Sequence, residues 1–138
     1  MSNKDTMQHF YDELNAGNTG VVDEVLTDDF VEHDEFPGIP QTREGVKQFF
    51  EMSRAAFPDF EIRVLHIVEE GDVAIAHGTL EGTHEGDFMG MPGTGNRISV
   101  PMADVVRFDA DGRAVEHWGV TDTGMMMMQL GAVPEPAA

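Results

Sequence analysis

The sequence predicts an α+β fold in which a curved antiparallel sheet of at least four strands wraps around N-terminal helices. Two observations predict it: apolar residues recur at helical spacing over residues 3–56, and at the two-residue spacing of strands after Pro58. Four long strands beside three short helices would expose one apolar face if the sheet were flat. We therefore expect the sheet to curl into a cone-shaped barrel whose open mouth forms a pocket.

The chain length sets the expected domain organisation. At 138 residues and without an internal repeat, the chain has room for one domain. We place this domain at residues 1–131. Residues 132–138, which include two prolines, are expected to form a flexible C-terminal tail.

Three helices are expected in the first half of the chain. They cover, in order, residues 3–16, 21–26 and 43–56. The first helix has one apolar stripe at helical spacing, formed by Met7, Phe10, Tyr11 and Leu14. Between the second and third helices, Asp28 and Asp29 mark a turn and the prolines of residues 36–40 exclude regular helix. Thr42 is the expected N-cap of the third helix.

Four long strands are expected in the second half. They cover, in order, residues 60–69, 73–81, 98–108 and 113–121. A glycine-rich loop, residues 82–97, separates the second strand from the third and contains Phe88, Met89 and Met91. Methionine side chains adapt to irregular apolar shapes, so this loop suits a flap over a flat hydrophobic ligand. A short helix over residues 124–130 follows the last strand.

The charge balance excludes several classes of partner. Lys and Arg together number 8 and Asp and Glu number 26, so the formal net charge is −18. A chain so poor in Lys and Arg lacks the cations that bind nucleic acid backbones or anionic membrane surfaces. No apolar run approaches the length of a spanning helix, and the start of the chain lacks the apolar stretch of a signal peptide. We therefore expect a cytoplasmic protein that binds neither nucleic acid nor membranes.

The acidic surplus has two interpretations, which the sequence leaves open. Acidic residues at the expected loops and strand ends suit an ordinary solvated surface that keeps the protein soluble. Their combination with only two lysines, Lys4 and Lys47, also fits a host with high internal salt.

Several catalytic and cofactor motifs are absent from the sequence. The chain has no cysteine, and none of its three serines lies in a G-x-S-x-G motif, so thiol nucleophiles and a hydrolase elbow are excluded. No G-x-G-x-x-G turn occurs. Residues 33–35 and 84–87 carry ligand-type side chains, but no histidine pair has the spacing of a metal-binding helix. We therefore expect no cofactor and no metal.

Asp104 is the strongest candidate for chemistry. Strand alternation places it on one face with the apolar residues Met102, Val106 and Phe108. Burial there would suit a carboxyl group that acts as a general acid, a base or a neutral hydrogen-bond donor. The alternative is that this face meets solvent and Arg107 points inward, which would bury a guanidinium without a partner.

Two histidines are further candidates. His33 precedes the proline segment, where the chain would cross the mouth of the cone, and an imidazole there suits proton transfer. The alternative for His33 is a surface histidine. His117 lies on the last strand in phase with Gly119, whereas Trp118 belongs to the other phase. An outward tryptophan is too large to leave in water, so it indicates a subunit interface and a homodimer.

Several motifs occur together along the chain. They comprise the segment 81–95, the runs Val106-Arg107-Phe108, Asp111-Gly112-Arg113 and Glu116-His117-Trp118, and the run Gln129-Leu130-Gly131. In this order they resemble the SnoaL-like polyketide cyclases, also called ester cyclases. The resemblance spans nearly the whole chain and implies the cone-shaped α+β barrel that this family shares with ketosteroid isomerase and nuclear transport factor proteins.

The resemblance also implies chemistry. The family's cyclases close a ring of an aromatic polyketide by intramolecular aldol condensation without a cofactor. Carried over by position, their pocket residues correspond to His33, Met102 and Asp104. Their proton-transfer aspartate corresponds to Gly119, which is placed on the pocket side together with His117. Because glycine cannot move a proton, this chain departs from the family's mechanism at that position.

A shorter similarity links the chain to ketosteroid isomerase. The run Asp104 to Asp109 resembles the isomerase strand whose aspartate stays protonated and donates a hydrogen bond to an enolate oxygen. In that arrangement a tyrosine of the first helix is the second donor, and another carboxylate is the base. By position, the similarity implies Tyr11 as the donor and either Asp34 or Glu35 as the base.

Together these observations predict a cofactor-independent SnoaL-like enzyme that removes a proton alpha to a carbonyl group of a small hydrophobic or aromatic substrate. We expect Asp104, His33 and His117 to be catalytic. The other residues expected to line the pocket are Met102, Gly119, Tyr11, Phe36, Phe88, Met89 and Met91. Gly119 leaves a second interpretation, a non-catalytic module that binds a small molecule, and water addition or hydroxylation in the same pocket is a third.

Overall fold

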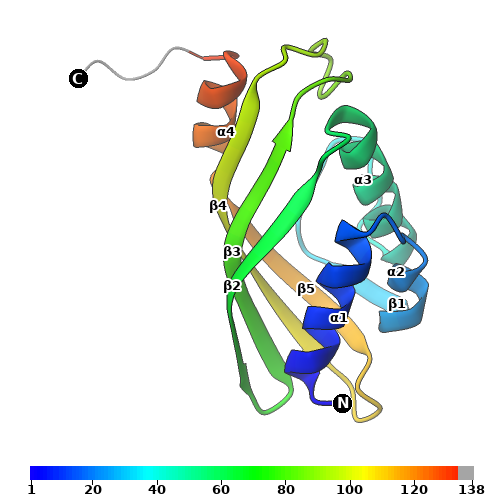
Figure 1. Cartoon of the computed structure of the whole chain (residues 1–138). Helices are drawn as coiled ribbons and strands as arrows, with labels where there is room; N and C mark the ends of the chain where they lie inside the picture. The colour runs from blue at the N-terminus through cyan, green and yellow to red at the C-terminus, as the bar shows by residue number, and fades with distance from the viewer. Residues whose placement is uncertain (134–138) are drawn as a thin grey trace.

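The computed structural model describes residues 1–133 and shows three helices packed on one side of a curved sheet (Figure 1). In chain order the elements are α1 (Asn3–Asn15), α2 (Val21–Val25), β1 (Leu26–Glu32), α3 (Arg43–Ala56), β2 (Glu61–Glu70), β3 (Val73–Thr83), β4 (Arg97–Phe108), β5 (Ala114–Thr121) and α4 (Thr123–Leu130). The strand order is β1-β5-β4-β3-β2, so β1 and β2 are the edges of a sheet that does not close. The predicted α+β fold is confirmed.

Two expectations concern the C-terminal tail and helices that could cross a membrane. Ala132 and Val133 are exposed after α4. The rest of the expected tail, residues 134–138, lies outside the described residues. Within residues 1–133, no helix has both the length and the apolar character needed to cross a membrane.

Both long helices begin at side-chain caps. The Ser2 hydroxyl accepts a hydrogen bond from the Asp5 N–H, and the Asp5 carboxylate accepts one from the Ser2 N–H. Thr42 caps α3 as expected, since its hydroxyl accepts from the Gly45 N–H. The buried stripe of α1 then turns Tyr11, which is 3% exposed, into the interior.

The register of the sheet positions Asp104 on the concave side. In β4, Asp104 lies opposite Ala76 of β3 and Gly119 of β5. Its neighbours Met102 and Phe108 are buried, whereas the Arg107 guanidinium pairs with Glu116 at 2.7 Å on the outer side. The face of β4 that faces the helices is therefore the one predicted from alternation.

The structure contains one strand that the sequence interpretation missed. β1 lies at an edge of the sheet and pairs in parallel with β5, which places Glu32 opposite His117. We expected Asp28 and Asp29 to mark a turn because aspartate is rare in strands, but both residues are exposed and their charges stay in water. The sheet is therefore mixed rather than purely antiparallel, and Leu26 begins β1 instead of ending α2.

The glycine-rich loop between β3 and β4 is tied to the core. His84 is fully buried, and its Nδ1 lies 3.0 Å from the Thr94 hydroxyl oxygen. Phe88 is also buried and forms a backbone bridge with Met91. Met89 lies at the tip of this short turn with a left-handed φ of 51° and is 58% exposed. The loop thus presents Phe88 to the interior and Met89 to the rim.

Candidate active site

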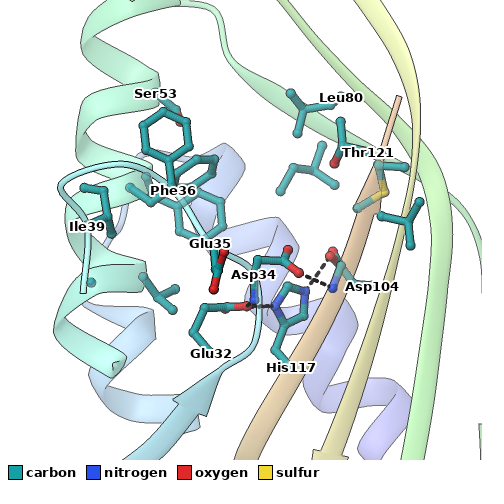
Figure 2. A pocket seen from close by; sticks show the side chains of 18 of the residues that line it. Glu32, Asp34, Glu35, Phe36, Ile39, Ser53, Leu80, Asp104, His117 and Thr121 are labelled. Carbon is teal, nitrogen blue, oxygen red and sulfur yellow. Dashed lines mark hydrogen bonds and ion pairs between the residues drawn. The ribbon is translucent and has the colours of Figure 1, made fainter. Parts of the chain in front are cut away.

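The helices and the concave face of the sheet enclose a cavity of about 800 Å³. Its volume lies within the range of small-molecule sites. Most of the lining is apolar, and its aromatic members include Phe10, Phe36, Phe49, Phe50, Phe60 and Phe88. In Figure 2, Phe36 and Ser53 lie on the helix side of the cavity, whereas Asp104 and His117 lie on the strand side. A ligand bound here would therefore have rings along one flank and acid–base groups along the other.

His117 is the centre of the polar end of the cavity. Its Nδ1 lies 2.6 and 2.8 Å from the two carboxylate oxygens of Glu32. Its Nε2 lies 2.7 Å from Asp104 Oδ1. Figure 2 shows the imidazole held between these two carboxylates. The β1–β5 and β4–β5 pairings bring the three residues together, because both strands flank β5.

Asp104 accepts a second hydrogen bond. The Tyr11 hydroxyl of α1 donates to Asp104 Oδ2 at 2.6 Å. Burial and the adjacent negative charge of Asp104 both raise the pKa of Tyr11 well above its usual value, so the phenol keeps its proton. Two donors, the phenol O–H and the imidazole Nε2–H, thus converge on one carboxylate at the end of the cavity.

The imidazole carries a positive charge at neutral pH. Burial alone would lower the pKa of His117, but the hydrogen bonds and negative charges of Asp104 and Glu32 outweigh it and raise the pKa to about 10. The side chains of Asp104 and His117 are each 18% exposed. The site therefore holds an imidazolium that is mostly shielded from solvent but accessible from the cavity.

Asp34 supplies a third carboxylate near His117. It follows β1, and its Oδ1 accepts a hydrogen bond of 2.8 Å from the Gly119 N–H. Burial among its neighbours raises the pKa of Asp34, although the Gly119 hydrogen bond and the charge of His117 oppose the shift. Asp34 is open to the cavity and points toward the same region as Asp104 (Figure 2).

Three side chains at the polar end of the cavity also have the composition of a metal site. Glu32, Asp34 and His117 each bring one potential ligand atom within 4.8 Å of the others. A histidine ligand must be neutral, with a nitrogen lone pair free for the metal. Here both imidazole nitrogens contact carboxylates, so a metal on Nδ1 would have to replace the proton between His117 and Glu32.

The model of the SnoaL-like polyketide cyclase family matches residues 5–130 of the sequence. The chain belongs to the SnoaL-like polyketide cyclase family. This result confirms the resemblance drawn from the motifs of the second half. No match was found among curated proteins.

Several solved structures are similar to this chain over most of its length. IdmH from Streptomyces antibioticus, a proposed polyketide cyclase, is 34% identical with a TM-score of 0.82, and the match covers 95% of this chain and 99% of IdmH. TsrD from Streptomyces laurentii is 28% identical with a TM-score of 0.84, covering 94% of both chains. AclR from Streptomyces galilaeus, a proposed hydroxylase, is 27% identical with a TM-score of 0.86, covering 98% of this chain and 84% of AclR.

Most residues that the sequence predicted for the SnoaL-like pocket do line the cavity. Asp104 and His117 meet there, together with Tyr11, Met102, Gly119, Phe36, Phe88 and Met89. Met91 is not among the lining residues, because it packs against the buried core next to Phe88.

The structure does not bring His33 to this group. Its ring stacks on Trp118 with centroids 4.6 Å apart, and its Nε2 lies 2.8 Å from a Glu116 oxygen. In an extended chain successive side chains point to opposite sides, so Glu32 and Asp34 face the cavity while His33 faces away. The alternative interpretation of His33, a histidine on the outer surface, fits its position.

Glu32 is the site residue that sequence reasoning missed. The signal for it was present, since Phe30, Glu32 and Asp34 recur at the two-residue spacing of a strand. Using that signal required recognising β1 as a strand. The parallel pairing of β1 with β5 then joins Glu32 to His117, which is 85 residues away in the sequence.

Proposed function

We propose that this SnoaL-like protein catalyses proton transfer alpha to a carbonyl group of a neutral, apolar and aromatic substrate. One observation carries the proposal: the Tyr11 hydroxyl and the His117 imidazole both contact Asp104 at the polar end of an otherwise apolar cavity. Such a site can hold an aromatic ketone in the apolar part and direct its carbonyl oxygen to the donors.

The chemistry needs a proton acceptor and a means of stabilising negative charge. When the α-carbon loses its proton, the electron pair of the C–H bond moves onto the carbonyl oxygen and forms an enolate. The positive charge of His117 stabilises that oxygen. The Tyr11 O–H and the His117 Nε2–H, which now donate to Asp104, lie where they can donate to the enolate oxygen instead. The enolate carbon then takes back a proton or attacks a second carbonyl in an aldol ring closure.

The charges around the cavity support a substrate without negative charge. Glu32, Asp34 and Asp104 surround one imidazolium, so the polar end keeps a net negative charge while these carboxylates are ionised. An anionic ligand would be repelled in such a poorly solvated site. A carbonyl group in an aromatic framework meets no such repulsion and matches the phenylalanine-rich lining.

The proposed reaction needs neither a cofactor nor a metal. Proton transfer and aldol closure involve no net oxidation, and the acid and base groups all come from the chain. We therefore expect exhaustive treatment with EDTA to leave the rate of proton exchange unchanged. A loss of activity that Mg²⁺ or Zn²⁺ restores would contradict this part of the proposal.

Deuterium exchange tests the proposed function. The probe is 2-tetralone, a neutral bicyclic ketone with acidic α-hydrogens, followed by proton NMR in D2O with and without the protein. We expect the protein to accelerate the loss of the α-hydrogen signal in a saturable way. The proposed function is wrong if the protein binds 2-tetralone, seen by line broadening, but its exchange rate equals the buffer rate.

That negative outcome defines the second candidate function, a non-catalytic module that binds a small molecule. Gly119 favours it, because this position carries the proton-transfer aspartate in the family pattern. Hydroxylation is a third candidate, because the similar protein AclR is a proposed hydroxylase. It would be recognised by a product that contains one additional oxygen atom.

A further inference from the structure

Asp34 fills the space that a side chain at position 119 would occupy. A Cβ atom built on Gly119 would lie 2.2 Å from Asp34 Oδ2 and 3.0 Å from His117 Cε1. The distance of 2.2 Å to Asp34 Oδ2 is much shorter than a van der Waals contact. Any residue other than glycine at position 119 would therefore have to move the Asp34 carboxylate.

The backbone does not explain this glycine. Gly119 lies inside β5 and is not among the described glycines with positive φ. Glycine within a strand weakens the strand and commonly marks the close approach of another group. Here the approaching group is the Asp34 carboxylate, which receives the Gly119 N–H at 2.8 Å.

Asp34 is also the carboxylate near His117 that keeps an oxygen free. Both Glu32 oxygens contact His117 Nδ1, and the two Asp104 oxygens accept from His117 and Tyr11. Asp34 Oδ1 accepts from Gly119, but no donor from residues 1–133 meets Oδ2. Asp34 lines the cavity, and a carboxylate oxygen without a donor there is positioned to take a proton from a bound molecule.

The similarity to ketosteroid isomerase left Asp34 and Glu35 open as the base. We propose that Asp34 is the catalytic base of this cavity and that position 119 is glycine because its side chain would displace that base. The inference rests on the proposed proton transfer and names the atom that performs it. Asp34 Oδ2 forms an O–H bond as the substrate C–H bond breaks, and the electron pair moves onto the carbonyl oxygen. The proton then returns to carbon, or it passes to the new alkoxide after an aldol closure.

The local electrostatics agree with this role. The groups that face Asp34 are His117, Glu32 and Asp104, and the net result of burial and these charges is a raised pKa. A carboxylate with a raised pKa is a stronger base, and it takes up protons from a substrate more readily than an ordinary aspartate.

The first test replaces Asp34 with its closest neutral analogue. Asp34→Asn keeps an oxygen that accepts from the Gly119 N–H but removes the basic group. With 2-tetralone in D2O, we expect kcat for exchange to fall at least about a hundredfold. We also expect the acid limb of the wild-type pH profile to disappear. Asp111→Asn, an exposed carboxylate in the β4–β5 turn, is the matched control and should exchange like the wild type.

The second test addresses the steric claim. Gly119→Ala should reduce exchange strongly in the wild type, because its methyl group displaces the carboxylate. In an Asp34→Ala background the 2.2 Å contact is gone and only the 3.0 Å contact with His117 Cε1 remains, so Gly119→Ala should reduce the residual rate much less than it reduces the wild-type rate, as a coupled pair requires. Gly124→Ala is the control, since the nearest atom to its added Cβ is 3.7 Å away. Equal effects of Gly119→Ala in both backgrounds would disprove the steric claim.

The outcomes separate this inference from the proposed function. If the wild type does not accelerate exchange, the proposed function fails and the inference falls with it. If the wild type is active and folded Asp34→Asn exchanges equally fast, Asp34 is not the base, while the proposed function stands. Melting temperatures of all variants show that each is folded at the assay temperature.

Discussion

His117 shows how one residue acquires its chemistry from its surroundings. An isolated imidazole loses its charge near neutral pH, but the carboxylates of Glu32 and Asp104 hold the pKa of His117 at about 10. Removing Glu32 or Asp104 would leave the charge of His117 with only one of its two partners at a mostly buried position. Loss of a partner from a buried ion pair generally lowers the free energy of unfolding strongly. The same arrangement that stabilises the fold therefore keeps a proton donor ready at the cavity.

The raised pKa of His117 predicts a pH dependence of stability. The unfolded pKa is near 6.5 and the folded pKa is about 10, so the folded state binds the proton more tightly. The stabilisation from the imidazolium is complete below about pH 6.5 and is lost as the pH rises toward 10. We expect the free energy of unfolding, measured with urea, to fall over this window in the wild type.

His117→Gln is the comparison for that measurement, because glutamine cannot carry the charge. Its unfolding free energy should change less across the same pH window, while being lower than that of the wild type at neutral pH. Parallel curves for the two proteins would show that His117 is not held as an imidazolium in the folded state.

Asp104 illustrates what single-residue reasoning could predict from the sequence. Period-two alternation along β4 indicated its face, and the burial of Met102 and Phe108 agrees with that indication. His33 shows the limit. An imidazole suits proton transfer, but whether His33 faces the cavity depends on the alternation of side chains along β1. Two aspartates in this segment, Asp28 and Asp29, made it look like a turn rather than a strand.

At the scale of elements, β1 and the loop before β4 complete the cavity. β1 places Glu32 beside β5, and the chain after it places Asp34. The helices and the four long strands were predictable because their periodicity is local. The pairing of β1 with β5 was not, because it joins segments about 85 residues apart and rests on tertiary contacts rather than on a local pattern.

The loop tip offers a test at this scale. Met89 is the non-glycine residue with positive φ in the described part of the chain, and its side chain lines the cavity. Asparagine tolerates this backbone conformation better than methionine but contributes less apolar surface. We expect Met89→Asn to keep or slightly raise the melting temperature while weakening 2-tetralone binding several-fold. Unchanged affinity in an NMR titration would show that the tip does not cover the ligand.

At the scale of the whole molecule, the outer face of the sheet carries a row of apolar side chains. Ile75, Val105 and Trp118 lie in register across β3, β4 and β5 on this face, and Ile75 is 39% exposed. Trp118 is partly covered by His33 on its ring face, and the Arg107 guanidinium lies 5.6 Å from its ring centroid. From the row of apolar side chains we propose that this face is the interface of the homodimer expected from the sequence.

We expect the protein to be a dimer at micromolar concentration. Val105→Lys, which places a charge in the middle of the apolar row, should shift the mass measured by light scattering toward the monomer. The substitution should leave the fold intact because this side chain points away from the cavity. A wild-type monomer at the same concentration would contradict the dimer.

The fold and the family were thus accessible from the sequence because they depend on periodicity and motif order. The assembly of the acid–base group was only partly accessible. Asp104 and His117 could be named individually, whereas the contact of Glu32 with His117 and the position of Asp34 beside Gly119 depend on the three-dimensional approach of β1 to β5.

The most direct test of the proton-transfer site is the rate of deuterium incorporation into 2-tetralone by the wild type and by Asp104→Asn. Asparagine keeps the shape of the side chain but removes the charge that holds His117 and aligns the donors. We predict saturable exchange by the wild type and a kcat at least about a hundredfold lower for folded Asp104→Asn. Equal turnover by the two proteins would contradict a catalytic role for this polar end of the cavity.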